Sequence, residues 1–149
     1  MIGDDGRWSD PKVARRILTE FHVWAVVGAS PDPTRPSHGV SRSLLRFGYE
    51  VIPIYPVAAM IHGLATVPDL STAAAARPAD RPIEVVDIFR ASHRAGAHVD
   101  EAIEIGARAV WLQLGVWDEA AAERAAAAGL LVVMDRCPAI DYPRMVAAG

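Results

Sequence analysis

The chain has little of what several classes of protein need. It has one cysteine, Cys137, which excludes an internal disulfide. It also has only one lysine, Lys12, and no run of lysines and arginines that would suggest a nucleic-acid surface. The N-terminal residues contain no apolar segment typical of a signal peptide, and no apolar run reaches membrane-spanning length. A net charge of −3 with 52% hydrophobic residues is typical of a globular protein. We therefore expect a cytoplasmic protein that binds neither nucleic acid nor a membrane.

Two common nucleotide-binding motifs are also absent. No G-K-[ST] sequence of a Walker A loop occurs. The dinucleotide fingerprint G-x-G-x-x-G is not met, because Ser30 and Pro33 stand where its second and third glycines belong. The segment Tyr55-Pro56, at the end of the second expected strand, lacks the carboxylate that would hold a ribose hydroxyl. A small NAD(P)-binding oxidoreductase is thus disfavoured and stays an alternative.

The five histidines form no metal-binding pattern. None is paired at the i, i+4 spacing of a helical metal site, and a zinc site has no second cysteine to use. No Ser-His-Asp arrangement or carboxylate pair indicates hydrolysis. We expect no metal site and no catalytic residue in this chain.

The most informative stretch is residues 23–40, VWAVVGASPDPTRPSHGV. An apolar strand leads to Gly28, and a proline-rich loop then turns into a helix. A glycine after a buried strand, followed by a helix N-terminus, is a common way to bind phosphate. The loop also supplies hydroxyl and guanidinium donors, namely Ser30, Thr34, Arg35 and Ser37. An ordinary strand-to-helix turn that binds nothing is the alternative interpretation.

Five short apolar strands alternate with helices along the chain. We expect the strands at 23–27, 50–55, 83–89, 109–114 and 130–134. Strands this apolar are buried on both faces, which implies a parallel sheet with right-handed crossovers. We predict an α/β fold, a single Rossmann-like three-layer domain over residues 1–149 with strand order 3-2-1-4-5. Within it, residues 1–20 would form a helix packed on the sheet, 57–72 a loop with a short turn, and 135–149 a C-terminal tail.

In such a sheet, ligands bind at the carboxyl ends of the strands, around the switch point that this order places between strands 1 and 4. The sequences at these ends are Gly28-Ala29-Ser30, Tyr55-Pro56, Phe89-Arg90, Gln113-Leu114-Gly115 and Asp135-Arg136-Cys137-Pro138. Arginines, a glutamine, aromatic rings and the one thiol are therefore expected at the same edge.

These residues carry a resemblance to a known family. The chain is similar to small stand-alone coenzyme A (CoA)-binding proteins, relatives of the CoA-binding domain in the α subunit of succinyl-CoA synthetase. The matching blocks are VVGASPDPTRPSHGV at 26–40, GYEVIPIYP at 48–56, VDIFR at 86–90, AVWLQLGV at 109–116 and VVMDRCPAIDYPR at 132–144. Tyr55 departs from the family, which usually has an asparagine there. The synthetase's phosphorylated histidine and ATP-grasp partner have no counterpart in this chain.

The resemblance implies binding of CoA or an acyl-CoA without catalysis. It assigns the phosphates to Gly28, Ala29, Ser30, Arg35 and Ser37. It assigns the nucleotide pocket to Pro56, the adenosine to Phe89 and Arg90, and the pantetheine arm to Gln113 and Gly115. An interaction module whose partner supplies catalysis is a further alternative, and the sequence leaves a homo-oligomer open, since Trp24, Trp111 and Trp117 suit either a core or an interface.

Cys137 is expected near the thiol end of the ligand, because it follows the fifth strand at the binding edge. Two neighbouring thiols can form a mixed disulfide under oxidation, and the adjacent Arg136 would favour the reactive thiolate. Packing as a small buried hydrophobic side chain is the alternative.

Overall fold

The computed structural model describes residues 6–147, so residues 1–5 and 148–149 of the predicted domain lie outside the described residues. The helices are α1 (Pro11–Glu20), α2 (Pro36–Phe47), α3 (Leu70–Ala75), α4 (Ser92–Glu104), α5 (Glu119–Ala127), α6 (Pro138–Tyr142) and a π-helix, η1 (Pro143–Ala147). The strands are β1 (Val23–Val27), β2 (Glu50–Ile54), β3 (Met60–Ile61), β4 (Leu64–Ala65), β5 (Val85–Ile88), β6 (Ala109–Leu112) and β7 (Leu131–Val133). The five predicted strands correspond to β1, β2, β5, β6 and β7.

These five strands form one parallel sheet in the order β2-β1-β5-β6-β7. Val27 of β1 lies beside Ile54 of β2 on one side and beside Ile88 of β5 on the other. Every residue of β1, β5 and β6 is buried, which explains why these segments are apolar throughout except for Asp87 in β5. The predicted fold class, a Rossmann-like α/β domain with a parallel five-stranded sheet, is confirmed.

The predicted strand order, 3-2-1-4-5, is wrong in the place of the third strand. That strand, β5, pairs with β1 on the side away from β2, so the order is 2-1-3-4-5 and the switch point lies between β1 and β5. Pro53 explains why β2 stands at the edge, because it lacks the N–H group that a strand with two neighbours donates. Its carbonyl oxygen accepts a hydrogen bond from Val67 N (2.9 Å), a loop residue beyond the sheet edge.

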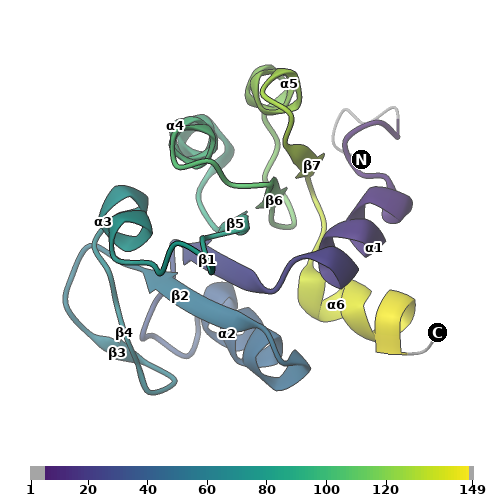
Figure 1. Cartoon of the computed structure of the whole chain (residues 1–149). Coiled ribbons are helices and arrows are strands. Elements are labelled where there is room, and N and C mark those ends of the chain that lie inside the picture. The colour runs from purple at the N-terminus through teal and green to yellow at the C-terminus, as the bar shows by residue number, and fades with distance from the viewer. Residues whose placement is uncertain (1–5, 148–149) are drawn as a thin grey trace.

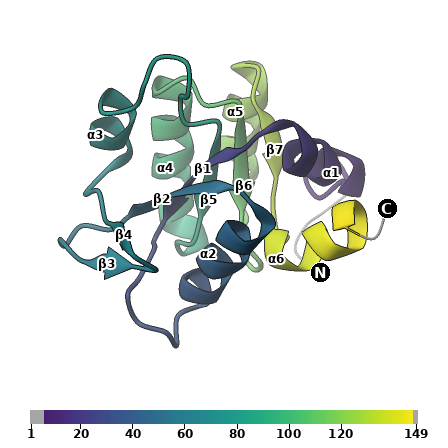
Figure 2. The same ribbon diagram turned by 60° about the horizontal axis from the view of Figure 1, so that its bottom comes forward.

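Helices cover both faces of the sheet (Figures 1 and 2). On one face α1, α2 and α6 pack over a hydrophobic cluster that contains Trp24 and Trp111. On the other face α3, α4 and α5 pack over a cluster that contains Val86 and Ile88. Trp24 and Trp111 are fully buried and belong to the core, and Trp117 packs partly buried against the second cluster.

Two segments contain more regular structure than predicted. The expected loop at 57–72 contains the antiparallel β3–β4 hairpin, which turns through His62 and Gly63, both with positive φ. The expected tail at 135–149 contains α6 and η1, and Tyr142 of α6 stacks on Phe47 of α2 with ring centroids 4.1 Å apart. Elements this short hold too few residues for hydrophobic periodicity to reveal them.

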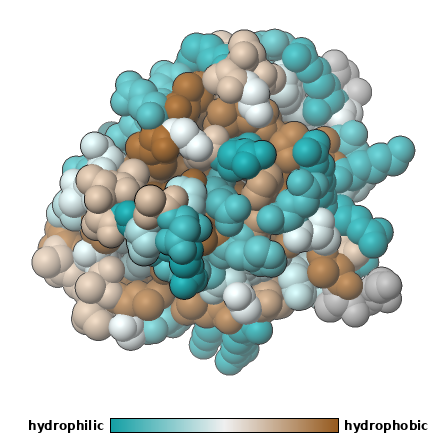
Figure 3. Space-filling model, in the orientation of Figure 1, coloured by the Kyte–Doolittle hydropathy of each residue, from teal (hydrophilic) through white to brown (hydrophobic). Residues whose placement is uncertain are grey.

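Among the described residues, no helix has both the length and the apolar character needed to cross a membrane. The face seen in Figure 3 shows several separate hydrophobic areas among hydrophilic ones. The exposed large hydrophobic side chains are Val57, Met60, Leu114 and Ile140.

Candidate functional site

A cavity of about 800 Å³ opens at the carboxyl ends of the strands, around the switch point between β1 and β5. This volume is in the range of small-molecule and cofactor sites. All the predicted binding residues except Gly115 line it: Gly28, Ala29, Ser30, Arg35, Ser37, Pro56, Phe89, Arg90, Gln113 and Cys137. Residues without a predicted binding role complete the wall: Val27, Pro36, Val40, Ile54, Tyr55, Pro68, His98, Leu114 and Val116.

Two long helices, α2 and α4, lack the acidic caps of their neighbours. The start of α2 lines this cavity, and α4 follows Arg90, which also lines it. Asp10, Asp69 and Asp118 cap α1, α3 and α5, and their side chains accept hydrogen bonds from backbone N–H groups. Arg35 and Ala91 occupy the N-cap positions of α2 and α4, and neither makes a side-chain cap bond. The positive ends of α2 and α4 therefore carry no capping carboxylate, which favours an anion beside them.

The guanidinium groups of Arg35 and Arg90 are available to a ligand. Between residues 6 and 147, neither group makes a hydrogen bond or an ion pair, although the Asp32 carboxylate attracts Arg35 through its charge. Arg77, Arg124 and Arg136, by contrast, are each held by a carboxylate. A partnerless arginine in a cavity wall suits phosphate, because its planar donors match the phosphate oxygens.

The loop between β1 and α2 is held by its own polar groups. The Asp32 carboxylate accepts hydrogen bonds from the backbone N (2.9 Å) and the hydroxyl (2.8 Å) of Thr34, and these bonds lower the pKa of Asp32. The Ser30 hydroxyl accepts a bond from Asp32 N (3.1 Å), which leaves its proton free to donate to a ligand. Thr34, expected to offer its hydroxyl to phosphate, uses it inside the loop and does not line the cavity.

Gly28 is required by the neighbouring strand. Its φ of 82° lies in the left-handed region that favours glycine. A Cβ atom at this position would overlap the carbonyl oxygen of Phe89 and lie 3.1 Å from the carbonyl carbon of Phe89. The ends of β1 and β5 therefore lie very close together at Gly28. The sequence explains this glycine only by a phosphate-binding turn and does not predict the contact between the strands.

Two buried polar atoms in the cavity wall lack a hydrogen-bond partner among the described residues. They are the hydroxyl oxygen of Ser37 and Oε1 of Gln113, and the two residues as a whole are 2% and 6% exposed. Leaving a buried polar group unpaired costs about 1–3 kcal/mol. A ligand that bonds these two atoms would remove that cost. Ser41 of α2 and Asp87 of β5 also have buried oxygens without partners, but neither lines the cavity.

Gly115 stands apart from the other predicted residues. It does not line the cavity, and its N–H donates to Asp135 Oδ1 (2.7 Å) while its carbonyl oxygen accepts a bond from the Ser92 hydroxyl (3.3 Å). Both polar groups of Gly115 are thus used to hold loops together. Its neighbours Leu114 and Val116 line the cavity in its place.

Arg136 does not serve Cys137 as predicted. The guanidinium group donates to both carboxylate oxygens of Asp141 (2.8 and 3.1 Å) and to the carbonyl oxygen of Ser9 (3.1 Å). The charge of Arg136 is therefore paired with Asp141 and fixes α6 to the chain before α1. Cys137 itself is 6% exposed and lines the cavity.

His98 lines the cavity, and the sequence predicts no role for it. Its Nδ1 lies 2.6 Å from Glu101 Oε1, one turn further along α4. A pattern of histidine pairs at i, i+4 does not detect this i, i+3 contact between a histidine and a carboxylate. Within residues 6–147, no group of three or more His, Cys, Asp or Glu side chains could hold a metal ion.

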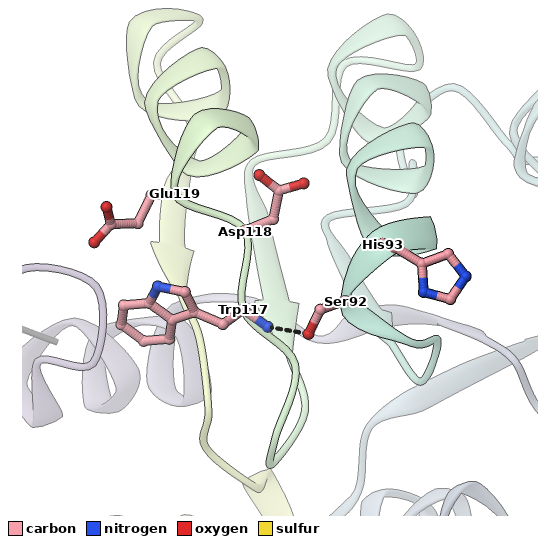
Figure 4. A pocket seen from close by; sticks show the side chains of 5 residues that line it. All are labelled: Ser92, His93, Trp117, Asp118 and Glu119. Carbon is pink, nitrogen blue, oxygen red and sulfur yellow. Dashed lines mark hydrogen bonds between the residues drawn. The ribbon is translucent and has the colours of Figure 1, made fainter. Parts of the chain in front are cut away.

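A second, more open hollow of about 500 Å³ lies between the start of α4 and the start of α5 (Figure 4). The Ser92 hydroxyl there accepts a bond from Trp117 N (3.0 Å), and Asp118 caps α5. The side chains of His93 and Glu119 point in different directions (Figure 4). Because these groups hold loops or diverge, this hollow lacks the convergent donors of the larger cavity.

Comparison with known proteins places this architecture in a family. A family model described as a CoA binding domain matches residues 22–143. The uncharacterized protein YneT of Bacillus subtilis (strain 168) is 35% identical over 123 residues, which are 83% of this chain and 87% of YneT. A hypothetical protein from Pyrococcus horikoshii OT3 shares 34% identity and a TM-score of 0.80, over 91% of this chain and 92% of its own. Cell-free ID.343 from Thermus thermophilus shares 30% identity and a TM-score of 0.79, over 91% of this chain and 98% of its own.

The matched region, residues 22–143, includes every residue that lines the larger cavity. The relatives are covered over nearly their whole length, as expected for small stand-alone proteins. The family model thus matches the segment that forms the sheet and the cavity at its switch point, and the chain belongs to the CoA binding domain family.

Proposed function

We propose that the cavity at the β1–β5 switch point binds coenzyme A, free or acylated, and that this chain itself catalyses no reaction. The observation that carries the proposal is a pair of arginines in the cavity wall, Arg35 and Arg90, which make no hydrogen bond or ion pair with the described residues and stand just before α2 and α4. Coenzyme A carries a pyrophosphate and a 3′-phosphate. Two guanidinium groups and two helix N-termini supply donors for these anions without a metal.

The rest of the wall fits the remaining parts of the ligand. We assign the phosphates to the segment Gly28-Ala29-Ser30 together with Arg35 and Ser37, whose buried hydroxyl has no protein partner. We assign the adenosine to the part of the cavity lined by Pro56, Phe89 and Arg90. Tyr55 lines the same cavity and offers a ring and a hydroxyl where the family usually has an asparagine side chain.

Gln113 suits the pantetheine arm. Its Oε1 is an acceptor without a partner among the described residues, and pantetheine contains two amide N–H groups that could donate to it. Leu114, which is 55% exposed, and the buried Val116 add apolar surface for the methylene groups of the arm. When bound, coenzyme A contributes a thiol or thioester at the end of this arm.

Calorimetric titration of the protein with CoA in EDTA is expected to give saturable one-to-one binding. Parallel titrations with acetyl-CoA, NAD and NADP distinguish the alternatives, because the missing glycines and the missing acid at Tyr55-Pro56 predict no response to either dinucleotide. A flat CoA trace with folded protein would refute the proposal. Binding of NAD with hydride-transfer turnover would favour the oxidoreductase instead, and no ligand response with a recovered partner would favour the interaction module.

Arg35→Ala is expected to weaken CoA binding by about tenfold to a hundredfold, because a charge-assisted contact contributes about 1.5–3 kcal/mol. Arg35→Lys should recover part of this loss, since the ammonium keeps the charge and lacks the planar fork. The measurement is the dissociation constant from calorimetry at fixed salt concentration.

Arg46→Ala is the matched control for this experiment. Arg46 is an exposed arginine in the last turn of the same helix, α2, and it does not line the cavity. Its loss should leave the CoA affinity unchanged. Equal effects of Arg35→Ala and Arg46→Ala would mean that Arg35 contributes only to the general surface charge.

A further inference from the structure

The strand order determines which residues lie on each side of a ligand in the cavity. A ligand whose phosphates lie at the β1–β5 switch point has β2 on one side of it and β6 and β7 on the other. Tyr55 and Pro56, at the end of β2, offer a ring and a flat apolar surface suited to a base. The other side holds Gln113 after β6 and Cys137 after β7, so an arm that leaves the phosphates away from the base extends toward Cys137.

The surroundings of Cys137 indicate a ligand independently of the thiol itself. Gln113 and Ser37 line the same cavity, both are more than nine-tenths buried, and each has a polar atom without a protein partner. Two such atoms in residues of one wall favour a bound molecule that supplies hydrogen bonds. Cys137 is 6% exposed and lines this cavity, so a molecule bound in the cavity would lie beside it.

We propose that Cys137 forms a mixed disulfide with the thiol of the ligand that the cavity holds. The proposal rests on the proposed function, because it takes coenzyme A as that ligand. The oxidant is the symmetrical disulfide of coenzyme A. The Cys137 thiolate attacks one sulfur of that disulfide, a new bond forms between Cys137 and one CoA, and the second CoA leaves as a thiolate. The proton lost by Cys137 goes to solvent or to the leaving thiolate, and Cys137 is oxidised while the released CoA is reduced.

The thiol–disulfide exchange at Cys137 depends on the bound ligand lying beside the thiol, and not on a nearby cation that activates it. Arg136 is adjacent in sequence, but its guanidinium group is bound to Asp141 and to the Ser9 carbonyl oxygen. Holding two reacting groups together speeds a reaction by replacing a bimolecular step with one inside the complex. Cys137 should therefore react much faster with a disulfide that carries the CoA nucleotide than with a disulfide of similar chemistry that lacks it.

Intact mass spectrometry after incubation with CoA disulfide tests the proposal. We expect an adduct of one CoA that dithiothreitol removes and that Cys137→Ser does not form. The rate should exceed that with oxidised glutathione at equal concentration by at least about tenfold, the factor by which one lost phosphate contact weakens binding. Arg35→Ala should reduce the rate with CoA disulfide by about tenfold or more, whereas Arg46→Ala, which lies outside the cavity, should leave that rate within about twofold.

The outcomes separate this proposal from the proposed function. Wild-type protein that binds reduced CoA by calorimetry but forms no adduct would overturn the disulfide and leave CoA binding intact. An adduct whose rate is the same in Arg35→Ala, or no faster than with oxidised glutathione, would also overturn it, because the thiol would then react without the site. Absence of both CoA binding and adduct would reject the two proposals together.

Discussion

Gly28→Ala is expected to remove about 3 kcal/mol or more of folding free energy and to abolish CoA binding. Two causes add at this residue. An alanine with a φ of 82° carries a conformational cost of about 1–2 kcal/mol. Its Cβ would also overlap the carbonyl oxygen of Phe89, so the ends of β1 and β5 would have to move apart. Because those two ends form the centre of the cavity, the phosphate site would be distorted in any molecules that still fold.

Gly106→Ala is the control that isolates the overlap from the backbone cost. Gly106 has a similar φ of 76°, follows α4 and would place its Cβ in open space. Its replacement should cost only the conformational part, about 1–2 kcal/mol, and should leave CoA binding unchanged. Urea unfolding of both variants measures the difference. Equal losses of stability would show that the close approach of β1 and β5 at Gly28 has no energetic consequence.

Most of the sheet could be predicted from the sequence. The predicted order misplaced β5, and Pro53 in β2 was the residue that could have corrected it. Runs such as VWAVV at 23–27 identify buried parallel strands, since no other short element needs apolar side chains on both faces. Pro53 interrupts the second run, and a proline inside a strand indicates an edge. That signal contradicts the order 3-2-1-4-5, which would place the second strand between two neighbours.

The site was predictable to the extent that it follows from topology. Parallel strands end at one edge, so Gly28, Arg90 and Gln113 lie around one cavity although the sequence separates them widely. Contacts between side chains and distant loops were not predictable in this way. The Asp135 carboxylate accepts a hydrogen bond from the N–H of Gly115, and the Asp141 carboxylate accepts one from the guanidinium group of Arg136. Neither contact follows from spacing or periodicity in the sequence.

Asp87→Asn is expected to make the protein progressively more stable than the wild type as the pH rises from about 4 toward neutrality. Asp87 lies in the middle strand β5, between Val26 of β1 and Trp111 of β6, and is fully buried. Neither of its carboxylate oxygens has a hydrogen-bond partner among the described residues. Burial without compensation raises the pKa of Asp87 well above its usual range, because the charged form has lost its water.

The sign follows from the direction of this shift. In the unfolded chain an aspartate has a pKa of about 3.9. A carboxyl whose pKa is raised by folding contributes its full stability below the unfolded value and loses it as the pH rises toward the folded value. In this interval the wild type should lose about 1.4 kcal/mol per pH unit relative to Asp87→Asn, whose amide does not titrate. Any cost of burying the amide is the same at every pH and does not affect the slope.

Urea unfolding of both proteins between pH 4 and pH 8 measures this slope as a difference, so contributions from all other groups cancel. Asp69→Asn serves as the control, because folding lowers the pKa of Asp69 whereas it raises that of Asp87. The backbone N–H of Thr72 bonds to the Asp69 carboxylate and lowers the pKa of Asp69, so its contribution changes only below the unfolded value and should be constant above about pH 5. If the difference between Asp87→Asn and the wild type is equally constant from pH 4 to pH 8, then Asp87 is ionised in the folded protein, and its oxygens must have partners that neutralise the cost of burial.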